Sequence, residues 1–267
     1  MPPALRPYLV CASQRSGSTV LCETLRSTGV AGNPLEHFEF LRTSGRPPQP
    51  REWFAGVDDP GLLALLAPLE QGSPPSEGPV EWRSRVLAEG RTPNGVWGGK
   101  LMWNQVGELL ARLEGLPGRS GTDLRSAVAD LLGEEPVYVH VHRPDVVAQA
   151  VSMWRAVQTQ RWRDDGAPAG DDGAVYHADG IAHLEAVLLE QERSWRRWFE
   201  DEGIEPVRIG FDDLKADVRA AAARVLEAVG LPGVPVSPPT MRRQGDGRSK
   251  QWAERYRSER AGAGGAA

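Results

Sequence analysis

The sequence has few cysteines, no excess of positive charge and no long apolar run. Its 267 residues contain only Cys11 and Cys22, too few for a disulfide framework, and both fall at positions predicted to be buried. The net charge of −5 gives no electrostatic support for a nucleic-acid partner. No run approaches the roughly 18 apolar residues of a membrane span, and no signal-peptide pattern opens the chain. We therefore expect a cytoplasmic protein without stable membrane insertion.

What the sequence does contain is an alternation of strand-like and helical segments. Four apolar runs predict strands: Tyr8–Ala12, Val96–Trp103, Pro136–His142 and Val207–Phe211. Helices are predicted at 19–28, 61–69, 79–89, 105–113, 122–132, from 146 onward, 180–202, 217–229 and 251–260. Strands separated by helices indicate an α/β fold with a parallel sheet, whose ligands bind at the carboxyl ends of the strands. We expect a single domain over 1–258 and a flexible tail over 259–267.

A small-residue loop, Gln14–Thr19 (QRSGST), joins the first strand to the first helix. A helix N-terminus binds anions through its amide groups and partial positive charge. Gly17 lets the backbone approach a ligand, and Arg15 adds a full charge. Three hydroxyl side chains can also donate, Ser16, Ser18 and Thr19. The loop is not a nucleoside-triphosphate loop, because G-x-x-x-x-G-K-[ST] is missing. Alone, it also fits a plain strand-to-helix turn.

Two further segments place arginines in loops. Arg143 follows the third strand, with Ser152 in the helix that Asp145 is expected to cap. Arg143 either faces a ligand or pairs with a neighbouring acid. Arg242 and Arg243 lie in an irregular segment that, taken alone, also fits a solvated basic patch.

Together these segments resemble the sulfotransferases that use 3′-phosphoadenosine 5′-phosphosulfate (PAPS). In that family a P-K-S-G-T-T-W loop holds the 5′-phosphosulfate, and Gln14–Val20 fits it with Arg15 in the Lys position. An Arg at a strand end and a Ser eight residues later contact the 3′-phosphate. Arg143 matches this Arg, whereas Ser152 lies nine residues on.

Two later elements extend the resemblance. Ile209–Asp217 is similar to I-x-Y-E-D-L-K-x-D, with Phe211 replacing the Tyr near adenine. Met241–Gly245, which contains Arg242 and Arg243, fits the family's F-M-R-K-G element loosely. The resemblance implies a three-layer P-loop-like fold, with a central parallel sheet flanked by helices, and PAPS as co-substrate.

Longer segments resemble the mycobacterial trehalose 2-sulfotransferase family over nearly the whole chain. They read ASQRSGST, PQPREWF, RTPNGVWGGKLMWNQ, HRPDVVAQAVSMWRAVQT and WAERYR. The resemblance implies transfer of the sulfuryl group of PAPS to the 2-hydroxyl of trehalose, an early step towards sulfolipid. It also implies a homodimer and release of the 3′,5′-bisphosphate product.

The family's roles fall on three residues of this chain. Arg15 is expected to neutralise the leaving phosphate through fixed charge. Glu36 matches the family's proposed general base, and burial among apolar neighbours would raise its pKa towards neutrality and improve it as a base. Glu39 and His37 are rivals, and Glu36 alternatively only hydrogen-bonds the sugar. Lys100 either assists the sulfuryl oxygens or pairs with an acid.

Aromatic faces bordered by polar groups suit sugars, so Trp53, Trp97 and Trp103 are candidate walls of the acceptor site, with Asn104 beside them. His140 and His142 alternate with valines and are expected to be packed, hydrogen-bonded histidines, since no third ligand at a suitable spacing indicates a metal.

Three other functions remain open. The acceptor could be another glycoside or a glycolipid. A non-catalytic protein that senses PAPS or the bisphosphate would use the same loops. A kinase is disfavoured, because the sequence lacks both G-K-[ST] and an acid placed after a strand to bind Mg²⁺.

Overall fold

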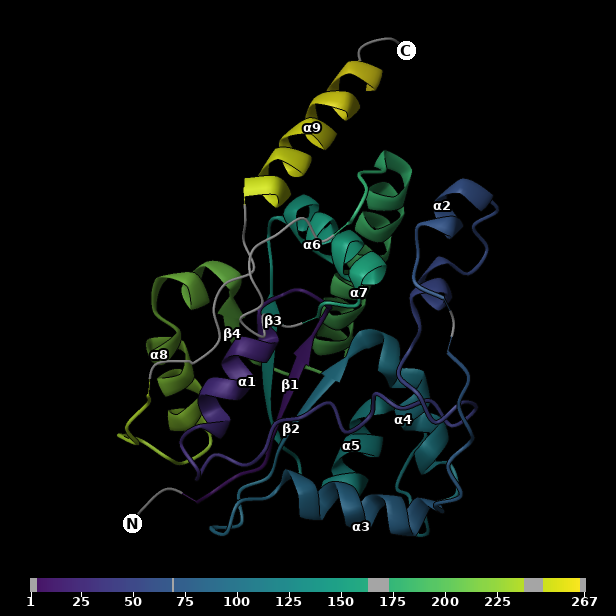
Figure 1. Cartoon of the computed structure of the whole chain (residues 1–267). Helices are drawn as coiled ribbons and strands as arrows, with labels where there is room; N and C mark the ends of the chain where they lie inside the picture. Colours follow the sequence, from purple (N-terminus) through teal and green to yellow (C-terminus); the bar gives the residue numbers. More distant parts are fainter. Residues whose placement is uncertain (1–3, 69, 163–172, 238–246, 265–267) are drawn as a thin grey trace. The chain divides into compact units, whose positions relative to one another are not determined.

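The computed structural model describes residues 4–68, 70–162, 173–237 and 247–264 (Figure 1). The chain divides into two compact units. The first unit comprises Met1–Pro47, Gln71–Arg143 and Gln191–Pro239, and the second comprises Pro48–Glu70, Pro144–Glu190 and Thr240–Ala267. Each is described below by itself, and the single domain expected over 1–258 stays a prediction.

The first unit is built on a four-stranded parallel sheet in the order β2-β1-β3-β4. Its strands are β1 (Tyr8–Ala12), β2 (Gly98–Met102), β3 (Val137–His142) and β4 (Val207–Gly210). Ala12 is level with Met102 on one side and Val141 on the other, and His142 is level with Gly210. The four strands therefore end at the same edge of the sheet, which confirms the predicted parallel α/β architecture.

Helices cover both faces of this sheet, as Figure 1 shows. Alternate strand side chains point to opposite faces, so Tyr8 and Val10 pack in one core with α1 and α8, and Leu9 and Cys11 pack in another with α3, α4 and α5. These helices are α1 (Ser18–Arg26), α3 (Pro79–Gly90), α4 (Val106–Leu113), α5 (Leu124–Leu132) and α8 (Phe211–Ala228). The expected three layers and the expected burial of both cysteines are confirmed.

Helix α8 begins earlier than the sequence pattern predicts. It starts at Phe211, directly after β4, and is interrupted at Asp217, where φ is −155° and ψ is 97°. Asp217 Oδ1 accepts hydrogen bonds from the amides of Arg219 and Ala220 and so caps the second half. The predicted start at Asp217 marks this second half, and the preceding turns place Phe211 at the edge of the sheet.

The second unit is helical where the structure describes it. It contains η1 (Pro50–Phe54), α2 (Pro60–Ala64), α6 (Val146–Thr159), α9 (Gly247–Gly264) and the part of α7 (Ala178–Asp201) up to Glu190. Trp154, Ile181 and Trp252 are buried in its core. Asp145 caps α6, as predicted, by accepting from the Ala148 amide at 3.0 Å.

Helix α9 continues past Arg260, where the sequence pattern ends it, to Gly264. No helix among the described residues combines the length and the apolar character that crossing a bilayer requires.

Candidate active site

The loop after β1 delivers the backbone to the N-terminus of α1 in a conformation that requires glycine. Gly17, the residue before α1, has φ 92° and ψ 0°, in the left-handed region. A Cβ atom at this position would lie 3.0 Å from Phe211 Cδ2 and 3.0 Å from Leu214 Cδ1. Both the backbone angle and the close approach of α8 therefore disfavour a side chain here.

The start of α1 fits an anionic ligand. The first amides of any α-helix lack an acceptor within the helix. Among the described residues, no side chain caps α1 and no acid lies in its first turn. Ser16 is fully buried, yet its Oγ has no hydrogen-bond partner within the described part of the chain. A buried hydroxyl is costly to leave unbonded, and a phosphate or sulfate oxygen would satisfy it together with the helix amides.

Arg143 reaches the same loop from the end of β3. Its Nη1 donates to the carbonyl oxygen of Arg15 at 3.1 Å, and its Cζ lies 4.1 Å from the centre of the Phe211 ring. This stacking is a cation–π contact. The strand ends thus bring together three residues that the sequence predicted to bind one donor molecule, Arg15, Arg143 and Phe211.

A buried ion pair lies across β1 from Arg143. Lys100, in β2, places Nζ 2.6 Å from Glu36 Oε1 and 3.1 Å from Thr19 Oγ1. The Lys100 side chain is 3% exposed and that of Glu36 is 22% exposed. Backbone pairing fixes the segment, because the Lys100 amide donates to Leu35 O at 2.9 Å. Lys100 therefore contacts both the helix that is predicted to bind an anion and the predicted base.

Two amide side chains after β2 complete this cluster. Gln105 Nε2 donates to Glu36 Oε2 at 3.0 Å, while its Oε1 accepts from the Met102 amide at 3.0 Å. Met102 is the last residue of β2, and Gln105 belongs to the short 3-10 helix η2 (Trp103–Gln105) that follows it. Asn104 Oδ1 accepts from Gln14 Nε2 at 2.5 Å, so the predicted residues Gln14 and Asn104 join the two loops. The sequence placed Gln105 after a strand, at the sheet edge where ligands bind, and at the end of the RTPNGVWGGKLMWNQ segment, but it assigned Gln105 no role in the site.

The surroundings of Glu36 differ from the apolar ones expected. Two apolar residues close to Glu36 in the sequence differ in burial, because Phe38 is buried in the core and Phe40 is 51% exposed. The groups that contact the Glu36 carboxylate include the Lys100 ammonium and the Gln105 amide, and such donors favour its ionised form. The expected apolar environment is therefore wrong for the carboxylate oxygens.

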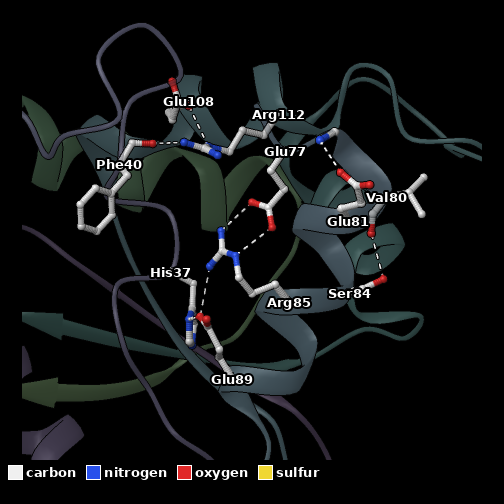
Figure 2. Close-up of polar contacts among 11 residues, drawn as sticks. His37, Phe40, Glu77, Val80, Glu81, Ser84, Arg85, Glu89, Glu108 and Arg112 are labelled. Carbon is white, nitrogen blue, oxygen red and sulfur yellow. Dashed lines mark hydrogen bonds and ion pairs between the residues drawn. The ribbon is translucent and has the colours of Figure 1, made fainter. Parts of the chain in front are cut away.

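The rival base His37 points away from this cluster. Its Nε2 lies 3.2 Å from Asn33 O and its Nδ1 lies 3.7 Å from Glu89 Oε2. Burial lowers the pKa of His37, partly offset by these two neighbours. Figure 2 shows His37 beside Glu89, which Arg85 also contacts. Glu39 stays a rival prediction.

The segment that follows Glu36 is fastened at its other end by Arg112 of α4. The Arg112 side chain is 7% exposed, and its guanidinium donates to Phe40 O and lies 2.8 Å from Glu108 Oε1 (Figure 2). Glu108 in turn accepts from the Arg42 amide at 2.8 Å. A buried arginine with such partners holds residues 40–42 in place, just as β2 holds Leu35.

The three tryptophans predicted as sugar walls occupy different environments. Trp97 is 2% exposed and donates through Nε1 to Val86 O at 3.0 Å, so its ring is a core residue in this structure. Trp103 is half-buried beside the cluster and packs edge-on against Trp195, with 4.9 Å between the two ring centres. Trp53 belongs to the second unit, and its contact with the sugar stays a prediction.

Three predicted phosphate ligands are not tested by the geometry. Ser152 lies in α6 of the second unit, so its joint contact with Arg143 stays a prediction. Arg242 and Arg243 lie outside the described residues.

Of the two histidines of β3, His140 is packed in the core, and His142 is half-buried. His140 is buried and contacts Glu192 Oε2 at 3.3 Å, as expected of a hydrogen-bonded core histidine. Within the part of the chain that the structure describes, no group of three or more His, Cys, Asp or Glu residues could hold a metal.

A helix start suited to an anion, an arginine stacked at the next strand end and a lysine–carboxylate pair linked to that helix are the arrangement expected of a group-transfer enzyme with an anionic donor. Residues 7–259 match the Stf0 sulphotransferase family, and the chain belongs to that family. Its sulfotransferase assignment, predicted from the motifs, is thereby confirmed. A sulfotransferase requires a sulfate donor as co-substrate.

Two relatives narrow the comparison. The chain is 56% identical over 256 residues to a trehalose 2-sulfotransferase of Mycobacterium tuberculosis, covering 96% of both chains. It is 51% identical over 252 residues to a trehalose 2-sulfotransferase of Mycolicibacterium smegmatis, covering 94% of both chains. The predicted likeness to the mycobacterial trehalose 2-sulfotransferases is confirmed at this level of identity.

Proposed function

We propose that this protein transfers the sulfuryl group of PAPS to the 2-hydroxyl of trehalose, with Glu36 as the general base. The acceptor rests on the two relatives at 56% and 51% identity and nearly full coverage. The donor rests on the loop before α1 and on Arg143, which lie at adjacent strand ends as a ligand with two phosphate groups requires. The proposal includes the homodimer, the cytoplasmic location and the early step towards sulfolipid that the family resemblance implies.

The donor side of the site works by fixed positive charge. When bound, PAPS supplies the sulfuryl group, and its nucleotide leaves as the 3′,5′-bisphosphate. The α1 amides, the Ser16 hydroxyl and Arg15 would hold the phosphosulfate end, while Arg143 and Phe211 would hold the nucleotide end. Arg15 stays charged throughout the reaction, so it offsets the growing charge of the leaving group without moving a proton.

The acceptor side works through Glu36, and the link from Thr19 through Lys100 to Glu36 is the observation that carries the proposal. Glu36 would take the proton from the attacking hydroxyl at a carboxylate oxygen, while Lys100 and Gln105 hold the carboxylate in place. Lys100 would hold the sulfuryl end and the base in one geometry. Positioning of this kind supplies much of the rate in transfers of charged groups.

The test compares Glu36→Gln with Glu39→Gln, a neighbouring acid changed in the same way. We expect Glu36→Gln to bind the 3′,5′-bisphosphate within twofold of the unchanged protein and to lose turnover by about 10²-fold or more, the usual scale for a general base. Glu39→Gln should keep its turnover. Near-normal turnover in Glu36→Gln would eliminate Glu36 as the base.

A second experiment tests the acceptor. The protein is incubated with radiolabelled PAPS and a panel of sugars that includes trehalose. Label on trehalose is the expected result, and label on another sugar alone would remove the acceptor assignment. Bisphosphate binding without transfer to any sugar would favour a non-catalytic sensor. Sedimentation of the same sample checks the homodimer.

A further inference from the structure

The amide group of Gln105 is fixed in orientation by what lies on either side of it. Its side chain is buried, and Oε1 accepts from the backbone amide of Met102. Only the oxygen can accept from that N–H, so Nε2 must face Glu36 Oε2, 3.0 Å away. Gln105 thus presents a donor, and never an acceptor, to the carboxylate.

We infer that Gln105 is a positioning residue for the reaction: it orients Glu36 and keeps it in the ionised, proton-accepting form. This inference rests on the proposed role of Glu36 as the base. Gln105 ends the RTPNGVWGGKLMWNQ segment of the family resemblance, but neither that resemblance nor the expected site residues give it a role.

Orientation follows from the two donors taken together. Lys100 of β2 contacts Oε1 and Gln105 of η2 contacts Oε2, so the plane of the carboxylate cannot turn without breaking one contact. The lone pairs that remain point in fixed directions. A base held in this way is already oriented towards the acceptor hydroxyl. A base that samples several rotamers is correctly placed less often, which lowers the rate of the transfer.

Ionisation follows from the charges that face Glu36. Glu36 faces the ammonium of Lys100 in β2 and the side-chain amide of Gln105 in η2. The hydroxyl of Thr19 in α1 is linked to Glu36 indirectly, because it accepts from the same Lys100 ammonium. The adjacent His37 faces Glu89 instead. A hydrogen bond donated to the charged form of an acid favours that form, so removal of the Gln105 donor should make Glu36 easier to protonate.

Two substitutions separate positioning of the base from support of the backbone. Gln105→Glu keeps an oxygen for the Met102 amide but turns a second carboxylate towards Glu36. Gln105→Met keeps the volume and removes both hydrogen bonds. Turnover of labelled PAPS and trehalose is measured for both from pH 5 to 9, and calorimetry with the 3′,5′-bisphosphate shows whether the donor side remains folded.

For Gln105→Glu we expect the acid limb of kcat/KM to move to higher pH by about one unit, because two adjacent carboxylates resist ionising together. Turnover should fall by about tenfold on the acid limb, at pH values below the shifted midpoint, and approach that of the unchanged protein at higher pH, with bisphosphate affinity unchanged within twofold. Gln105→Met should lose kcat at every pH, because the orientation of Glu36 is lost, while its KM for PAPS stays near normal.

A Gln105→Glu profile that superimposes on that of the unchanged protein would overturn the inference, since backbone support alone would then account for Gln105. A loss of equal size at every pH in Gln105→Glu would overturn it as well. Glu36→Gln distinguishes failure of this inference from failure of the proposed function. If Glu36→Gln abolishes turnover while Gln105→Glu is normal, Glu36 is retained as the base and only the role of Gln105 is refuted. If Glu36→Gln retains turnover, both fall.

Discussion

Replacing Lys100 by Met and Glu36 by Gln, singly and together, measures how strongly the ion pair stabilises the contact between β2 and the segment that carries Glu36, the proposed base. The two charges lie 2.6 Å apart. With an effective dielectric constant of about 20, Coulomb's law gives an attraction of roughly 6 kcal/mol. Desolvation of both charges offsets much of this attraction, so the net contribution is smaller.

The expected free energies follow from the unequal burial of the two side chains. Breaking a buried pair by removing one partner costs about 3–5 kcal/mol. Since the Glu36 side chain is 22% exposed, we discount the cost of Lys100→Met, which leaves this carboxylate without its ion pair, to about 2 kcal/mol. Glu36→Gln leaves the ammonium in a site that is 3% exposed, and we expect a cost of about 3 kcal/mol.

Urea denaturation of the four proteins at pH 7 provides the assay. The double variant should lose about 2 kcal/mol less than the sum of the single losses, which is the scale of coupling between residues in direct contact. Additive losses, within about 0.5 kcal/mol, would refute the reasoning. They would mean that each charge interacts with water rather than with its partner. An equal cost for the two single variants would contradict the argument from burial alone.

Two further predictions concern the donor loop and the pH dependence of stability. Gly17→Ala should lose stability and bind the bisphosphate less tightly, because its Cβ would displace the Phe211 ring on which Arg143 stacks. Gly29→Ala is the matched control: its φ is 71° but nothing lies within 4 Å, so it should show only the strain of about 1–2 kcal/mol, and equal bisphosphate affinity in both variants would refute the steric argument. His37 has a folded-state pKa below its ordinary value of about 6.5, so the unfolded chain binds its proton more readily and stability falls as pH drops below about 6.5. His37→Gln should lose less stability than the unchanged protein between pH 8 and pH 5.5 in urea denaturation, and an equal loss would contradict this assignment.

Much of the fold is local in origin and was therefore predictable. Tyr8–Ala12 is a run of five buried residues, which the sequence shows as an unbroken apolar segment. The side chains of Asp145 and Asp217 each cap the helix that follows them directly in the sequence. The turns between Phe211 and Asp217 were missed because they carry no apolar repeat of their own.

The parts of the site that lie in loops and at strand ends were predictable from the sequence. The loop with Gly17 and the arginine after β3 follow from motif and topology. The contact between Gln105 and Glu36 joins residues 69 positions apart, and no local pattern records it. A tryptophan in a sequence also does not reveal whether its ring lies in the core, as Trp97 does, or beside the site, as Trp103 does.

The attachment of the Glu36 segment to β2 has a consequence for solubility. β2 is an edge strand of the sheet, and an uncovered edge offers its backbone to strands of other molecules. Here Leu35 pairs with Gly99 and accepts from the Lys100 amide, so the segment leading to Glu36 shields part of that edge. If this segment lifts from the sheet, Glu36, the proposed base, leaves the site and the edge of β2 becomes exposed at the same time. Inactivation and aggregation on heating should therefore begin together.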